Sequence, residues 1–117
     1  MEKINQLIED VLISYNEYIN KIPNGIDNII RDFRNGNTDV AMELILQFTE
    51  GIQWLNEVNI LLEQNGFKIK IDRDTLNNFL VELSDGIESN DHNLVSDILE
   101  YEVKPFFETL INDEKVI

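Results

Sequence analysis

Few side chains in this sequence could carry out catalytic chemistry. His92 is the only histidine and cysteine is absent, so a thiolate nucleophile and a pair of histidine ligands for a metal ion are both excluded. Neither a glycine-rich phosphate loop nor a Gly-x-Ser-x-Gly nucleophile elbow occurs. We therefore expect a protein that is not an enzyme and that binds neither a metal ion nor another cofactor.

Glu102 is the carboxylate whose predicted position, near the apolar face of a helix, is the most unusual. It follows one apolar residue by four positions and precedes another by four, so helical spacing places it on or beside the apolar face. Pro105 lies close by and is expected to kink the helix near residues 101–104, because it cannot donate a backbone hydrogen bond. A buried carboxylate needs a partner such as Arg31, Arg34, a tyrosine or a freed backbone N–H. On this interpretation Glu102→Gln lowers stability.

Large aromatic residues on the predicted third and fifth helices could fill the core or form an interface, where aromatics are enriched. Phe106 and Phe107 are adjacent, so they cannot share one helix face, and one of them or Trp54 is expected near the surface. The candidate interaction or structural residues are Trp54, Tyr101, Glu102, Pro105, Phe106 and Phe107.

The charge is strongly negative and unevenly distributed. The chain has 23 acidic and 9 basic residues, a net charge of −14. Residues 39–67 contain five acids and no base, and residues 74–103 contain eight acids and no base. Such a surface repels phosphate backbones and anionic lipid, so we expect neither a nucleic acid nor a membrane as a partner. The acidic segments are either solvated helix faces or a docking face for a basic protein.

The composition favours an all-α fold. Glycine (5) and proline (2) are scarce, whereas long segments have helical periodicity. No apolar run exceeds three residues, and the N-terminus has no apolar core typical of a signal peptide. We therefore expect a cytoplasmic protein without a membrane span.

Helical periodicity and capping residues predict most element boundaries. An apolar stripe from Ile4 to Ile22 predicts a first helix, which Pro23-Asn24-Gly25 should end, and residues 26–33 predict a short second helix. The third helix should begin after Asn37 or Thr38 and end at Asn65-Gly66. Extra apolar residues widen its face, so this helix is either central or covered by a partner: Leu46, Trp54 and Leu61.

The remaining segments complete the predicted bundle. Residues 67–71 alternate with period two and should form an extended connector whose apolar side chains plug the bundle end. Asp72 or Asp74 should cap the fourth helix, and Asn90 or Asp91 the fifth. The prediction is an antiparallel bundle of four to five helices, with the third helix central, in a single domain spanning residues 1–117.

A weak internal similarity appears at an offset of 54 residues. It aligns Val40 with Leu94 and Leu44 with Ile98, without identity at the pairs compared. Two related helical hairpins would produce this pattern, and so would two unrelated hairpins that obey the same packing rules.

Two segments resemble a known family. Residues 39–45 leading to Glu50-Gly51-Ile52-Gln53-Trp54-Leu55, and Asp97-Ile98-Leu99-Glu100-Tyr101-Glu102-Val103-Lys104-Pro105, resemble a small uncharacterised family of helical proteins from low-GC Gram-positive bacteria. The resemblance implies a compact helical bundle and no known activity.

A weaker resemblance is to flagellar export chaperones, which are acidic bundles of similar length that hold the terminal helices of flagellin. The shared feature is a helix, a short polar turn and a helix, occurring here at residues 34–39 and again at 88–92. This resemblance implies a client-binding protein.

These observations leave three functions open. The first is a non-enzymatic adaptor that docks helices of a partner, or a second copy of itself, through apolar anchors flanked by acid. The second is a flagellar-chaperone-like client binder. The third is an acidic inhibitor that presents the carboxylates of residues 74–103 to a nucleic-acid-binding protein.

Overall fold

The computed structural model describes residues 2–112, with side chains from residue 6 onward. Ile4 of the predicted stripe and the predicted domain ends at residues 1 and 113–117 lie outside this description. Every regular element in the described range is helical: α1 (Glu2–Arg34), α2 (Thr38–Gln64), α3 (Arg73–Glu88), and a fourth helix made of α4 (His92–Ile98), the π-helical turn η1 (Leu99–Val103) and α5 (Lys104–Asn112).

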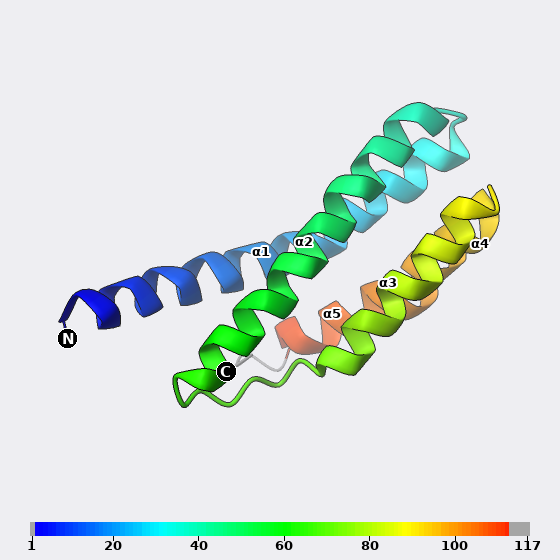
Figure 1. Cartoon of the computed structure of the whole chain (residues 1–117). Helices are drawn as coiled ribbons and strands as arrows, with labels where there is room; N and C mark the ends of the chain where they lie inside the picture. The colour runs from blue at the N-terminus through cyan, green and yellow to red at the C-terminus, as the bar shows by residue number, and fades with distance from the viewer. Residues whose placement is uncertain (1, 113–117) are drawn as a thin grey trace.

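The four helices form a ring in which each packs against its neighbours in sequence (Figure 1). α1 contacts α2, α2 contacts α3, α3 contacts α4, and the segments α4, η1 and α5 return to α1. The all-α bundle is confirmed, with four helices. α2 packs mainly against α1 and α3, so the prediction that this helix is central is wrong. The two hairpins are present as packing units, whereas their common origin stays a prediction.

α1 differs from the prediction because it passes through Pro23-Asn24-Gly25 without interruption. Figure 1 shows that α1 changes direction part-way along, as a helix with an internal proline does. Proline costs about 3 kcal/mol and glycine about 1 kcal/mol in a helix interior. Burying an isoleucine contributes roughly 1.5–3 kcal/mol. Four isoleucines beside or beyond the break are buried, so tertiary packing outweighs the local signal: Ile22, Ile26, Ile29 and Ile30.

The predicted caps are largely confirmed. Asn37 is the N-cap position of α2, although its side chain makes no capping hydrogen bond. Asp72 and Asp91 each accept a backbone N–H at the start of α3 and α4. Gly66 follows the end of α2 with φ at 87°, a left-handed conformation that glycine adopts readily.

The connector between α2 and α3 behaves as predicted. No helix or strand covers residues 67–71. Ile71 is buried, and Phe67 and Ile69 are half-buried against the core, so alternate residues close this end of the bundle.

The fourth helix contains a π-helical turn where the sequence predicts a kink. Lys104 donates its backbone N–H to the carbonyl of Leu99, five residues earlier, directly before Pro105. A π-turn holds one residue more than an α-turn, so every later side chain is shifted by one position. Val103 and Phe107 therefore take the core positions that a regular helix would give to Glu102 and Phe106.

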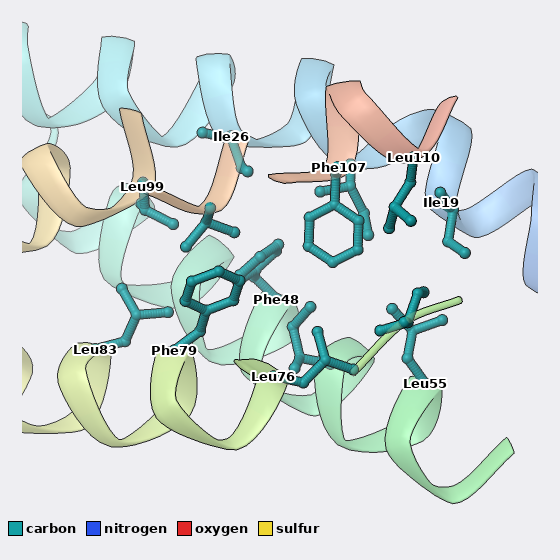
Figure 2. Packing of buried hydrophobic residues seen from close by; sticks show 14 of the residues in the cluster. Ile19, Ile26, Phe48, Leu55, Leu76, Phe79, Leu83, Leu99, Phe107 and Leu110 are labelled. Carbon is teal, nitrogen blue, oxygen red and sulfur yellow. The ribbon is translucent and has the colours of Figure 1, made fainter. Parts of the chain in front are cut away.

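The core runs between all four helices. Figure 2 shows the Phe107 ring turned toward side chains from α1, α2 and α3 in one buried cluster. One polar pair is buried with them. Tyr15 donates a hydrogen bond to Asn59 Oδ1, and burial raises the pKa of Tyr15, so the hydroxyl keeps its proton.

Candidate interaction surface

Two adjoining grooves follow the contact between α1 and α2. Their volumes are about 230 and 370 Å³, and Tyr18 and Lys21 of α1 line both. α2 contributes Phe48 to the first groove and Trp54 to the second. The Tyr18 and Trp54 rings meet edge to face with centroids 5.8 Å apart, so aromatic carbon forms part of the floor.

Two glycines shape these grooves in different ways. A Cβ at Gly51 would lie 1.7 Å from the Tyr18 hydroxyl oxygen, so Gly51 is needed for the Tyr18 ring to lie across α2. A Cβ at Gly25 would meet nothing within 4 Å. Gly25 therefore leaves open space that a side chain from another molecule could occupy.

A third groove lies further along the same helix pair. It has a volume of about 290 Å³ between the N-terminal part of α1 and the C-terminal part of α2. Its lining is almost wholly apolar, and Leu7 and Leu61 remain 64% and 45% exposed. In the following text, the α1–α2 groove means these three grooves together, lined on α1 between residues 7 and 29 and on α2 between residues 44 and 65.

Acidic side chains border the α1–α2 groove. Glu43, Glu50 and Glu57 are exposed on α2 at seven-residue spacing, which keeps them on one side of the helix. Each precedes a groove-lining residue by four positions, and residues four apart are neighbours on a helix surface. Glu17 of α1 lines the groove from the other helix.

The aromatic candidates from the sequence do not form one patch. Trp54 is half-buried in the α1–α2 groove, whereas Phe106 is half-buried against Phe79 of α3, with ring centroids 5.4 Å apart. Phe107 is fully buried, and Tyr101 is 69% exposed in the π-turn. The prediction that one of the three large rings lies near the surface is met by Trp54 and Phe106, but these two belong to different surfaces.

Glu102 is exposed, so the expectation of a carboxylate on the apolar face is wrong. The π-turn rotates it away from the core and places Val103 there. Arg34 bonds instead to Glu100, with 2.7 Å between Nη2 and Oε2. Glu102 lies close to Glu82 of α3, and the pKa of Glu82 is raised by burial and then by the neighbouring Glu102 carboxylate.

Glu82→Gln is expected to stabilise the protein at neutral pH. A carboxyl with a raised pKa in the folded state stabilises the fold at low pH, and that contribution is lost as pH rises through the raised pKa. The variant should gain about 1 kcal/mol or less relative to wild type at pH 7, and the gain should disappear by pH 4. Urea unfolding at both pH values measures it.

Asp97→Asn provides the control, since it removes one exposed negative charge from α4. It should show a smaller change between the two pH values. An equal or larger change would mean that general charge repulsion, rather than the Glu82–Glu102 contact, causes the effect. Glu102→Gln should also relieve the repulsion between the Glu82 and Glu102 carboxylates and so raise stability. The sequence had predicted a loss of stability for this variant.

Sequence reasoning identified Trp54 and the acidic segment 39–67, but it missed Tyr18, Gly25 and Leu7 as surface-forming residues. The spacing of the three α2 glutamates is visible in the sequence and could have indicated a single acidic edge. Nothing local could have identified the open space at Gly25, because the opposite wall comes from α2.

Comparison with family models identifies the family of this chain. A model described as a domain of unknown function (DUF8042) matches residues 10–113. The chain belongs to the DUF8042 family. No curated protein and no solved structure gives a significant match. The expectation of a family without a known activity is confirmed, whereas its restriction to low-GC Gram-positive bacteria and the resemblance to flagellar export chaperones find no support.

The DUF8042 match includes most of the α1–α2 groove, with Leu7 and Ile8 preceding it. Among the helices described in residues 2–112 of this DUF8042 chain, none combines the length and the hydropathy that a membrane-spanning helix needs. Across the same described range, no group of three or more His, Cys, Asp or Glu side chains is arranged to hold a metal ion.

Proposed function

We propose that this DUF8042 protein is a non-enzymatic interaction module that holds a helix of a partner protein in the α1–α2 groove. The observation that carries the proposal is the uncovered apolar face of α2. α2 packs against α1 and α3, yet Trp54 is only half-buried and Leu61 remains 45% exposed. Apolar surface that the bundle itself does not cover is typical of a docking site.

The shape of the groove favours a helix as its occupant. Its lining on α1 extends from Leu7 to Ile29, which corresponds to about 30 Å at 1.5 Å per residue. A partner helix of about 20 residues matches this length, and side chains at i, i+3, i+4 and i+7 would supply apolar anchors to successive grooves. The proposal retains the expectation of a cytoplasmic protein.

The test is a pull-down from native extract, read by quantitative mass spectrometry, with a variant that blocks the groove. Gly25→Gln adds a side chain into open space and replaces a glycine in a helix interior, so it should raise helix stability by up to about 1 kcal/mol. Leu61→Gln removes an exposed apolar anchor in the third groove. The double variant should reduce capture of a groove-bound client at least tenfold.

Val81→Gln/Leu94→Gln is the matched control. It exchanges two exposed apolar residues of α3 and α4, outside the groove, for the same side chain. This control should retain the client, and both double variants should unfold cooperatively. If no protein depends on the groove in this comparison, the proposal is wrong.

The same experiment separates the other candidate functions. A groove-dependent client that persists at 1 M salt supports helix docking, because exposed charges are screened within about 3 Å there. Flagellin as that client would support the chaperone-like function. A basic protein that is lost at high salt and insensitive to the groove variants would support the acidic inhibitor. A dimer of this protein that dissociates in the Gly25→Gln/Leu61→Gln variant would mean that the groove binds a second copy of the chain.

A further inference from the structure

We infer that the occupant of the α1–α2 groove is a basic amphipathic helix, with Lys or Arg side chains that face Glu43, Glu50 and Glu57. The inference rests on the proposed function and specifies the chemistry of the partner. It combines two features of one surface, an apolar groove and an acidic edge beside it.

The three glutamates are positioned to meet a partner helix at regular intervals. They precede Gln47, Trp54 and Leu61 by four residues, and these three side chains line the three successive grooves. A helix lying along α2 would present a side chain of its own to each glutamate once every two turns. The pattern therefore calls for cations at seven-residue spacing beside the apolar anchors.

Within the part of the chain that the structure describes, no observed ion pair compensates this acidic edge. Among the described residues, the observed ion pairs join Arg34 to Glu100, Arg73 to Glu63 and Lys104 to Asp27, and none involves the three glutamates. 

On the α1 side of the groove, Glu17 adds a carboxylate, and Lys21 is the single base among the described residues that line it. A neutral occupant would leave these charges partly desolvated without partners, whereas a basic helix would pair with them.

A second copy of this chain fits the groove less well than a basic partner. Each chain carries a net charge of −14, so two copies repel each other before contact. An isologous dimer through this face would also bring the glutamate rows of both copies to the same interface. Charge complementarity therefore favours a different, basic chain.

Selection of helical peptides tests the partner chemistry directly. A displayed library of about 20-residue helices carries apolar residues at the anchor positions. Its flanking positions hold Lys, Gln or Glu in equal proportion. We expect wild-type protein to enrich Lys at flanking positions spaced by seven residues. The best peptide is then synthesised, and its dissociation constant is measured by titration at low salt.

Charge variants of the protein provide the second readout. Glu43→Gln/Glu50→Gln/Glu57→Gln should weaken binding of the selected peptide about 3-fold to 100-fold, because each exposed ion pair makes a modest contribution. The matched control Asp85→Asn/Glu88→Gln/Asp97→Asn removes three exposed acids from α3 and α4 and should change binding by less than about 2-fold.

The outcomes distinguish this inference from the proposed function. Suppose that the enriched peptides carry Gln or Glu at the flanking positions and that Gly25→Gln/Leu61→Gln still blocks their binding. This result would overturn the inference of a basic partner and would support docking in the α1–α2 groove. Enrichment that the blocking variant does not affect would overturn both. Equal weakening by the two triple variants would also overturn the inference, since net charge alone would then explain the binding.

Discussion

Phe107→Ala is expected to lower the free energy of unfolding by about 3–5 kcal/mol, the range for removing a fully buried phenylalanine ring. Phe107 has no exposed surface and lies in the cluster shared by all four helices (Figure 2). Domains of this size have a total stability of about 5–15 kcal/mol, so the variant should unfold at much lower urea concentration. Far-ultraviolet circular dichroism during urea titration measures the change.

Phe106→Ala is the matched control because it removes the same ring from the adjacent position. Phe106 is half-buried and makes an edge contact with Phe79, so its loss should cost only about 1–2 kcal/mol. Equal losses from the two variants would mean that the shift produced by the π-turn is absent in solution. A larger loss from Phe106→Ala would indicate a regular α-helix through residues 99–103.

Deleting Tyr101 in a Pro105→Ala background is expected to leave the bundle folded, with a stability change of less than about 1 kcal/mol. The π-turn contains one residue more than an α-turn, and the Tyr101 side chain within it is 69% exposed. After the deletion, Val103 and Phe107 follow Ile98 at four and eight positions, so a regular α-helix keeps both in the core. The proline is replaced because its ring would clash with the carbonyl of a regular helix.

Deletion of Asn78 provides the contrast. Asn78 is also exposed, but it lies within α3, where no additional residue is present. Its removal would rotate Phe79 and Leu83 by about 100° relative to Leu76, and all three are buried. This variant should lose cooperative thermal unfolding, whereas the Tyr101 deletion should retain it. Loss of the fold in both would show that the π-turn is required for packing of the fourth helix.

The sequence alone predicted the features of this protein that depend on short-range interactions. Capping by Asp72 and Asp91 and the end of α2 at Gly66 involve residues a few positions apart, so their signals are complete within one segment. The helical class and the acidic, cysteine-free surface follow from periodicity and composition in the same way. Of the candidate interaction surface, the sequence could predict Trp54 and the acidic segment of residues 39–67.

The remaining features depended on contacts between helices distant in sequence. α1 continues through Pro23 because burial of the isoleucines beside and beyond it stabilises the fold by more than the proline and glycine destabilise the helix. Glu102 is exposed because the π-turn before Pro105 brings Val103 and Phe107 into the core. Packing against the other helices determines this register. The α1–α2 groove exists only where side chains from both helices face each other. Local spacing predicts which faces are apolar, but only tertiary packing determines which of them the fold itself covers.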